Sequence, residues 1–181
     1  MELFDFKFKL FSTEIDISEF DCKDADINAF LRDDALNYQR QLMANTYVFT
    51  KGETGKEKVV AFFCISNDCL NDLYDNSAFN KLHRKIKLPN EKRIRQYPAV
   101  KVGRLGVDNK YHGTGISYQL MDFIKGYSIM DSKPACRLLL LDAYNKPKQL
   151  SFYAKNGFEF LLSTGVEDKT RIMYFDLLTL H

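Results

Sequence analysis

The sequence predicts a mixed α/β fold, in which helices pack on a strongly twisted sheet. Segments typical of strands and of helices follow one another in the order β-α-β-β-(α)-β-α-β-α-β-β, judged by the period of the apolar residues. The first strand is indicated by a strict alternation of apolar and polar side chains over residues 4–10. The continuous apolar run at 136–141 is typical of a central strand that is covered on both faces.

An amphipathic helix is expected after the first strand. Asp24 and Asp26 are both suitable N-caps, because an aspartate side chain accepts hydrogen bonds from the first N–H groups of a helix. Residues at helical spacing give this segment an apolar face that we expect to be buried, made of Ile27, Phe30, Leu31, Tyr38 and Leu42.

Two strands joined by a hairpin are predicted next. Residues 46–49 and 59–65 are rich in β-branched and aromatic side chains, and the glycines of residues 52–55 between them are typical of a turn. The segment 67–98 is less regular than the rest of the chain. Within it we expect a helix at 70–88, followed by a loop.

The C-terminal part predicts one helix and a final pair of strands. Pro147 is suited to the first turn of this helix, because its fixed φ angle is helical and its missing N–H is not needed there. Asn156 and Gly157 are suited to its left-handed end. The segments 158–161 and 172–175 then predict two closing strands, which we expect to pair.

Length and composition favour one globular domain over residues 1–181. A chain of this length with 45% hydrophobic residues can bury a core without disulfides or a metal. The four cysteines are scattered without a C-x-x-C pair, and the three histidines lack ligand spacing, so we expect reduced thiols and no metal site. No apolar stretch reaches the roughly 18 residues that a membrane span needs, and the acidic, alternating N-terminus is unlike a signal peptide. We therefore expect a cytoplasmic protein.

The stretch from Ala99 to Leu120 has the most informative pattern in the chain. A strand predicted at 100–107 carries glycines, which indicate either a bulge or a place where a ligand lies against the backbone. A loop at 108–115 follows, with two further glycines, and a helical pattern comes after it. N–H groups at the start of a helix, reached through a glycine-rich loop, suit a phosphate. The residues themselves leave a phosphate site and a plain tight turn open, because the Rossmann and P-loop patterns are incomplete.

Three segments resemble the GNAT acetyltransferases. Lys110-Tyr111-His112-Gly113-Thr114-Gly115 resembles the pyrophosphate loop of that family, and Arg104-Leu105-Gly106-Val107-Asp108 is similar to its splayed fourth strand. Residues 151–158, SFYAKNGF, are similar to its F-Y-x-x-x-G-F signature. The resemblance implies the GNAT acyl-CoA N-acyltransferase fold, a twisted mixed sheet of about seven strands with helices on both faces and a splayed fourth strand.

The resemblance also implies an activity, acetyl-CoA-dependent N-acetyl transfer. In this family the acetyl group passes directly from the thioester to a primary amine through a tetrahedral intermediate. The backbone of Leu105, Gly106 and Val107 would hold the pantetheine arm and the acetyl oxygen. Tyr153 would be the catalytic residue that protonates the departing thiolate, and no general base is identified. The other residues expected to contact acetyl-CoA are Lys110, Tyr111, His112, Gly113, Thr114, Gly115, Ile116, Ser117 and Asn145.

The acceptor amine is left open. Residues 20–22, the helix after them and residues 97–100 look like the GNAT toxins of toxin–antitoxin operons, which acetylate the α-amine of aminoacyl-tRNA. Basic residues concentrate between Lys81 and Lys101, and those expected to hold a tRNA are Arg84, Lys85, Arg93, Arg95 and Arg104. The net charge of only +2 favours a small-molecule or protein amine instead.

Other partners follow only from the resemblance. Similarity to the toxins implies an antitoxin protein, and members of the GNAT family often form homodimers. A non-catalytic module that binds CoA or a protein partner is a further alternative. The presence of Tyr153 and of the Gly113 and Gly115 pair favours an enzyme over such a module.

Overall fold

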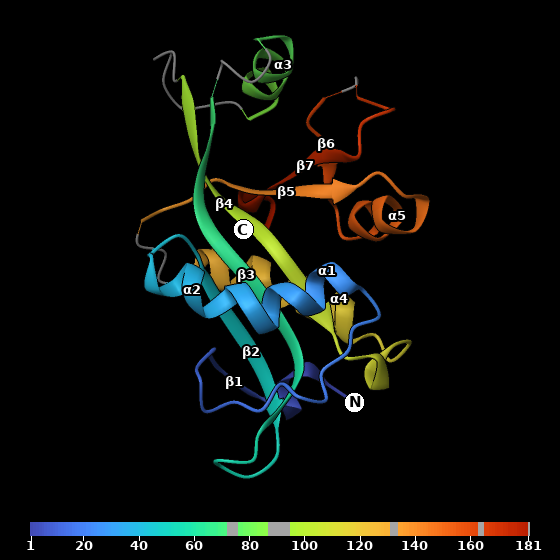
Figure 1. Cartoon of the computed structure of the whole chain (residues 1–181). Coiled ribbons are helices and arrows are strands. Elements are labelled where there is room, and N and C mark those ends of the chain that lie inside the picture. The colour runs from blue at the N-terminus through green and yellow to red at the C-terminus, as the bar shows by residue number, and fades with distance from the viewer. Residues whose placement is uncertain (72–75, 87–94, 131–133, 163–164, 181) are drawn as a thin grey trace. The chain divides into compact units, whose positions relative to one another are not determined.

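The computed structural model describes residues 1–71, 76–86, 95–130, 134–162 and 165–180. Its strands form a seven-stranded sheet in the order β1-β2-β3-β4-β5-β7-β6 (Figure 1). The chain divides into two compact units, the first made of Met1–Ser66 and Val102–Ile124, the second of Asn67–Lys101 and Lys125–His181. β3, β4 and α4 each pass from one unit to the other. The organisation of residues 1–181 as a single domain stays a prediction.

The order of the elements confirms the predicted mixed α/β fold. The strands are β1 (Lys7–Leu10), β2 (Asn45–Lys51), β3 (Lys58–Asn71), β4 (Gln96–Val107), β5 (Leu138–Tyr144), β6 (Glu159–Phe160) and β7 (Thr170–Asp176). The helices are α1 (Ala25–Ala29), α2 (Ala35–Arg40), α3 (Asn76–Ile86), α4 (Ile116–Ile129) and α5 (Pro147–Lys155). β4 pairs with β5 in parallel, whereas β1 with β2, β2 with β3, β5 with β7 and β6 with β7 pair antiparallel, so the sheet is mixed.

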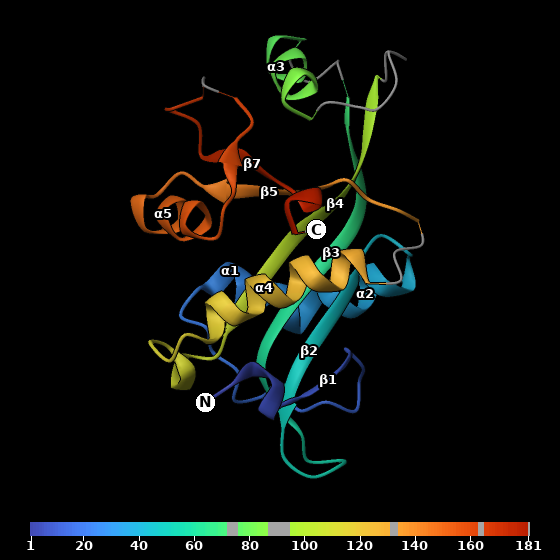
Figure 2. The same cartoon turned by 180° about the vertical axis from the view of Figure 1, so that it is seen from behind.

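The first unit has helices on both faces of its strands. α1 and α2 lie on one face, in front in Figure 1, and α4 lies on the other, in front in Figure 2. On the α1 side, Phe30 and Leu31 are buried in a cluster with Val48 and Phe62. On the α4 side the ring of Phe123 packs 4.9 Å from that of Phe49 and 4.7 Å from that of Phe8, measured between centroids. The alternation of β2 and β3 side chains between the two faces explains both clusters.

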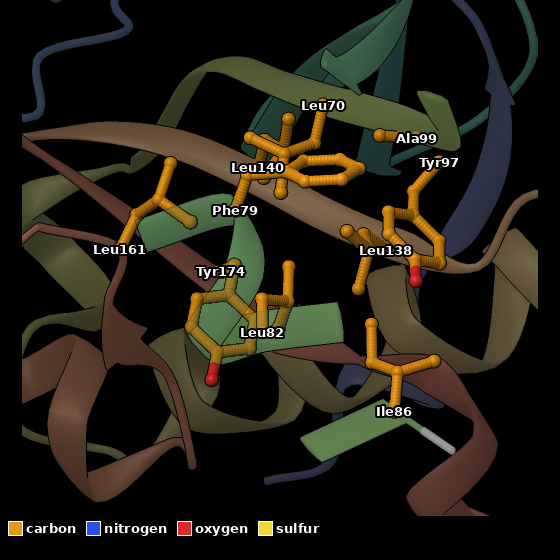
Figure 3. Packing of buried hydrophobic residues seen from close by; sticks show 10 residues of the cluster. All are labelled: Leu70, Phe79, Leu82, Ile86, Tyr97, Ala99, Leu138, Leu140, Leu161 and Tyr174. Atoms are coloured by element: carbon orange, nitrogen blue, oxygen red, sulfur yellow. The ribbon is translucent and has the colours of Figure 1, made fainter. Parts of the chain in front are cut away.

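The second unit is built around β5. Leu138, Leu139, Leu140 and Leu141 are all buried, which confirms the apolar run as a central strand with β4 on one side and β7 on the other. Leu138 and Leu140 face α3 and form a cluster with its apolar side chains (Figure 3). On the opposite face, the ring of Phe175 lies 5.6 Å from that of Phe158.

Helix ends follow the predicted signals closely. The side chain of Asp24 accepts hydrogen bonds from the N–H groups of Asp26 and Ile27, so Asp24 is the N-cap of α1. Pro147 begins α5. Gly157 has a φ of +83°, and the Phe158 N–H donates to the Tyr153 carbonyl at 3.0 Å, which closes the helix in the left-handed manner expected.

Two N-terminal predictions are wrong in part. Leu3–Asp5 is a 3-10 turn and the strand starts only at Lys7, because Leu3 is fully buried while Phe4 is 78% exposed. The helix is interrupted by a π-helical segment, Phe30–Asp34, and ends at Arg40. Leu42 therefore lies beyond the helix with a φ of +57° and is 93% exposed instead of buried.

Two further corrections concern the segment before β4, where the sequence pattern is least regular. β3 continues to Asn71, so Leu70 belongs to a strand, where it is buried in the cluster of Figure 3. The helix of this segment is shorter than expected, Asn76–Ile86. Residues 87–94, which hold the expected end of this helix and most of the predicted loop, lie outside the described residues, and the loop expected up to Pro98 is wrong at its end because Gln96 already belongs to β4. Tyr38, predicted to be buried on the helix after the first strand, is 45% exposed as well.

A buried carboxylate fixes the hairpin between β2 and β3. Glu57 is 3% exposed, and it accepts hydrogen bonds from the Lys9 ammonium at 2.7 Å and from the Gly55 N–H at 3.2 Å. Its carbonyl accepts from the Asp16 N–H. The Lys9 ammonium, and after it the Gly55 N–H, hold the pKa of the Glu57 carboxyl below its ordinary value of 4.5.

We expect Glu57→Gln to destabilise the protein at neutral pH and much less in acid. A carboxyl whose pKa is lowered by folding contributes stability above its unfolded pKa, and this contribution is lost as the pH falls through the folded pKa. The measurement is urea unfolding of both proteins from about pH 7 to about pH 3. Glu53→Gln, an exposed residue of the same hairpin, is the control and should change little. If the difference in free energy of unfolding between wild type and Glu57→Gln stays constant over this pH range, the ion pair between Glu57 and Lys9 does not contribute to stability.

Candidate active site

The loop between β4 and α4 is anchored at its beginning and open at its end. Asp108 is 3% exposed, and its side chain caps the turn that follows by accepting from the Lys110 N–H at 2.9 Å. Gly113 and Gly115 have φ angles of +79° and +87°, the left-handed region that favours glycine. A Cβ atom added at either glycine would meet no atom within 4 Å. The backbone here is therefore bare and accessible to a ligand.

The start of α4 presents a group of N–H donors to this open loop. The N–H groups of Tyr118 and Gln119 both donate to the Gly115 carbonyl, at 3.1 and 3.2 Å. Within the described parts of the chain, the N–H groups of Gly113, Gly115, Ile116 and Ser117 have no acceptor. These donors and the positive end of the helix dipole have the character that an anion site needs, so the loop with its donors is called the anion loop below.

The side chains of the loop make contacts of their own. The Lys110 ammonium donates to Glu19 at 3.2 Å, and the ring of Tyr111 packs edge-on against Phe6 with centroids 5.6 Å apart. His112 Nε2 lies 2.9 Å from the Val107 carbonyl, and the Thr114 hydroxyl donates to the Tyr111 carbonyl. The residues predicted to hold the cofactor thus divide into two groups, backbone donors that are available and side chains that hold the loop.

Gly106 is explained by packing. A Cβ atom at this position would lie 2.9 Å from a ring carbon of Phe62 and 3.1 Å from a methyl of Ile27, closer than real Cβ contacts. Helix α1 therefore approaches β4 so closely that only glycine fits. Gly103, on the same strand, would place a Cβ 3.8 Å from the nearest atom, an ordinary contact. This packing is a third explanation beside the two considered for strand glycines, and the expected contact of a ligand with the Gly106 backbone stays a prediction.

A segment that the sequence analysis did not assign to the site lies against this loop. The Asn109 N–H donates to the Asp21 carbonyl at 2.8 Å, and its side-chain amide donates to the Asp21 carboxylate at 3.1 Å. The Asp21 N–H in turn donates a hydrogen bond to the Asp108 carboxylate at 3.3 Å. The sequence analysis noted residues 20–22 only for their similarity to the toxins, and the polar residues before the helix N-cap, which are common at helix starts, do not indicate a contact with the loop.

Arg104 stands on β4 at the edge of helix α1. Its guanidinium lies 3.5 Å from the Asp26 carboxylate and 5.8 Å from the ring centroid of Phe30. It also donates to the carbonyl of Gly103 at 3.0 Å. The contact with a neighbouring acid reduces the charge that Arg104 offers to a nucleic acid.

Tyr153 lies on α5 in the second unit. Its ring contacts those of Phe152 and Phe158, with centroids 5.2 and 5.9 Å away. Burial raises the pKa of the Tyr153 phenol to about 12, so the hydroxyl is protonated at neutral pH. No residue in the described ranges forms a hydrogen bond with this hydroxyl. The group is therefore a proton donor without a structural partner.

The remaining predicted residues have protein partners or fall outside the described chain. The amide of Asn145 donates to the carbonyls of Val166 and Asp168, so both of its contacts hold a neighbouring turn. Lys85 donates to Glu159 at 2.5 Å, and Arg84 donates to a carbonyl of its own helix. Arg84, Lys85 and Arg95 belong to the second unit, Arg104 belongs to the first, and Arg93 lies outside the described residues.

Within the described residues, no group of three or more His, Cys, Asp or Glu side chains is suited to a metal. The cysteines are all free, as expected, although Cys136 is only partly buried. No helix in the described ranges has the length and the apolar character to span a membrane.

Comparison with known proteins identifies the fold. Residues 84–160 match the family model of the Acetyltransferase (GNAT) domain. No curated protein matches the chain. This match and the structural similarities below confirm that the chain has the GNAT fold and bear out the resemblance seen in its motifs.

Several solved structures of toxins share this fold. The chain is similar to AtaT complexed with acetyl-methionyl-tRNAfMet, with a TM-score of 0.73 at 19% identity over 97% of each chain. It is similar to a mutant of KacT, with a TM-score of 0.69 at 18% identity over 96% of each chain. A mutant AtaT toxin bound to the C-terminus of the antitoxin AtaR and acetyl-CoA has a TM-score of 0.66 at 17% identity, covering 97% of this chain and 96% of that one.

We expect Gly106→Ala to lower the free energy of unfolding by about 1–3 kcal/mol, because the new methyl group overlaps Phe62 and Ile27. Chemical denaturation measures the change. Gly103→Ala is the matched control on the same strand and should leave stability within about 1 kcal/mol of wild type. Equal effects of the two substitutions would contradict close packing of α1 as the reason for Gly106.

Proposed function

We propose that this protein is an acetyl-CoA-dependent N-acetyltransferase. The observation that carries the proposal is the group of N–H donors at Gly113, Gly115, Ile116 and Ser117, which have no acceptor in the described chain. A pyrophosphate fits such a site, because its charge is matched by the helix dipole and its oxygens by the N–H groups. The GNAT domain match and the acetyl-CoA bound in an AtaT structure support the same assignment.

The end of β4 is proposed to hold the reacting end of the donor. Acetyl-CoA supplies an activated thioester, and N–H groups aimed at its carbonyl oxygen would stabilise the negative charge that develops when an amine attacks. By resemblance to the family, these groups belong to Leu105, Gly106 and Val107. Backbone donors keep this role when the side chain changes, because substitution leaves the N–H in place.

Tyr153 is proposed to hold the proton that the departing thiolate takes up. Its hydroxyl is protonated at neutral pH, since burial raises its pKa to about 12. The amine attacks in its neutral form, and its nitrogen loses a proton to solvent once the N–C bond has formed. As the C–S bond breaks, the thiolate takes the Tyr153 proton, and solvent returns a proton to the phenolate. The roles of Lys110, Tyr111, His112, Thr114 and Asn145 in cofactor binding stay predictions.

We propose the α-amine of aminoacyl-tRNA as the acceptor. The similarity to AtaT complexed with acetyl-methionyl-tRNAfMet supports this acceptor. The basic residues Arg84, Lys85, Arg95 and Arg104 would contact the phosphate backbone. The similarity to AtaT bound to the antitoxin AtaR supports an antitoxin as a protein partner, and homodimer formation is a further proposal.

A small-molecule or protein amine is the second acceptor that we consider. The observation in its favour is that two of the basic residues are already neutralised, Lys85 by Glu159 and Arg104 by Asp26. Together with a net charge of only +2, these ion pairs weaken the attraction for a polyanion.

We expect Tyr153→Phe to lower kcat about a hundredfold or more, because the proton donor is lost. The Kd for CoA and the Tm should stay at their wild-type values, since the hydroxyl has no structural partner in the described chain. Thiol release measures kcat, isothermal titration measures the Kd for CoA, and thermal unfolding measures the Tm. Tyr38→Phe, a change at an exposed tyrosine of α2, is the control. Unchanged kcat in Tyr153→Phe removes this residue from the mechanism, and absence of turnover in wild type with intact CoA binding favours a non-catalytic module.

Salt separates the two acceptors. If aminoacyl-tRNA is the substrate, raising salt from about 50 to about 200 mM should raise its KM at least tenfold, because counterions compete for the phosphates. The double variant Arg84→Ala/Arg95→Ala should raise this KM as well, with kcat little changed. Mass spectrometry of the acetylated aminoacyl group follows the reaction. Acetylation of a small amine but not of aminoacyl-tRNA, with little dependence on salt, establishes the second candidate instead.

A further inference from the structure

The two glycines of the anion loop have open space beside them. Gly113 and Gly115 have nothing near their Cα atoms on the side where a Cβ would stand. The start of α4 is held by Ile116, whose side chain is fully buried, so it is the direction of the N–H groups at Gly113 and Gly115 that depends on the anchored half of the loop, residues 108–111. A displacement there would turn the N–H donors away from a common point.

Asp21 supplies much of that anchoring from outside the loop. It accepts two hydrogen bonds from Asn109, one at its carbonyl and one at its carboxylate, and it donates one to the buried carboxylate of Asp108. Further outside contacts are the Asp108 N–H to the Val60 carbonyl, the exposed Lys110 ammonium to Glu19, and the ring of Tyr111 against Phe6. Asp21 thus contacts both residues that lead from β4 into the turn.

The same side chain is fixed to the start of helix α1. Its carboxylate accepts from the Lys23 N–H at 2.8 Å and from the Asn28 side-chain amide at 2.9 Å, and the Lys23 ammonium lies 2.8 Å away. The Asn28 side-chain oxygen Oδ1 accepts from the Cys22 N–H at 3.0 Å. Hydrogen bonds from Lys23 and Asn28 hold the pKa of the Asp21 carboxyl well below its usual range, so it is ionised at neutral pH.

Strain at Lys23 accompanies these contacts. Lys23 has a φ of +65°, which is uncommon for a residue with a side chain. Its N–H reaches the Asp21 carboxylate in this conformation. Backbone strain of this kind persists only where surrounding contacts determine it, and here the contacts converge on Asp21.

We propose that Asp21 is a positioning residue for CoA, which holds the turn at Asn109 so that the N–H groups of Gly113 and Gly115 point at the pyrophosphate. The inference rests on the proposed function, because it concerns the same anion site. Asp21 does not touch the ligand in this proposal, and its effect passes through the Asn109 hydrogen bonds.

A purely electrostatic role and a positioning role of Asp21 predict opposite changes in the affinity for CoA when the carboxylate is removed. If Asp21 acted only through its charge, Asp21→Ala would strengthen CoA binding, since a negative group near an anion site is removed. If Asp21 holds the turn, Asp21→Ala weakens CoA binding about tenfold, the loss expected for a hydrogen bond to a charged group. The sign of the change therefore decides between the two.

A swapped pair tests the hydrogen bond itself. Asn109→Asp sets two carboxylates against each other and should weaken CoA binding at least as much as Asp21→Ala. The double variant Asp21→Asn/Asn109→Asp exchanges amide and carboxylate, keeps the net charge of wild type and restores the bond. Asp16→Ala is the control, an exposed carboxylate whose side-chain contact lies within its own turn.

The readouts are the Kd for CoA by isothermal titration, and amide hydrogen exchange of Gly113 and Gly115 in the protein without ligand. We expect both single variants to bind CoA about tenfold more weakly and to exchange faster at these amides. The double variant and Asp16→Ala should bind within about twofold of wild type. If Asp21→Ala does not fold, Asn109→Asp and the double variant decide alone.

Two results overturn the inference. The first is an affinity of Asp21→Ala for CoA that equals or exceeds that of wild type. The second is an affinity of the double variant for CoA that is as low as that of Asn109→Asp. In both cases wild-type binding is intact and the proposed function stands. Failure of the wild type itself to bind CoA overturns the proposed function and this inference together.

Discussion

The site depends on the hydrogen bonds that the first turn of α4 does not make. Any helix has N–H groups at its start without partners inside the helix, and most proteins satisfy them with a capping side chain. Here the residue before the helix is Gly115, which has no side chain to offer, and the loop ahead of it turns through left-handed glycines. In the proposed function these N–H groups bind the pyrophosphate of CoA, whose charge would compensate for the missing cap.

Much of the fold was predictable because its signals are local. The period of apolar residues identified the strands and helices, and single residues such as Asp24, Pro147 and Gly157 marked helix ends. The errors arose where a long-range contact decided the outcome. Leu70 looked like part of a helix but is buried in a strand against α3, and Leu42 followed helical spacing past the point where the backbone leaves the helix.

The site was predictable in its backbone and less so in its side chains. Glycines at 113 and 115, read with the strand before them and the helix after them, predicted an open turn at a helix start but left a phosphate site and a plain tight turn open, and the resemblance to the family favoured the phosphate site. Spacing could not show that Lys110 pairs with Glu19, nor that Asp21 bonds to Asn109, because these partners are 91 and 88 residues apart in the chain. Likewise, a run of basic residues does not show which of them are already neutralised, as Lys85 is by Glu159.

The packing around Gly106 bears on how this kind of sequence should be compared with others. A glycine is required wherever Phe62 and Ile27 close on the strand as they do here, whether or not the protein binds a nucleotide. Glycine at position 106 therefore reflects how Phe62 of β3 and Ile27 of α1 pack on β4, whereas the glycines at 113 and 115 reflect the left-handed backbone of an exposed turn.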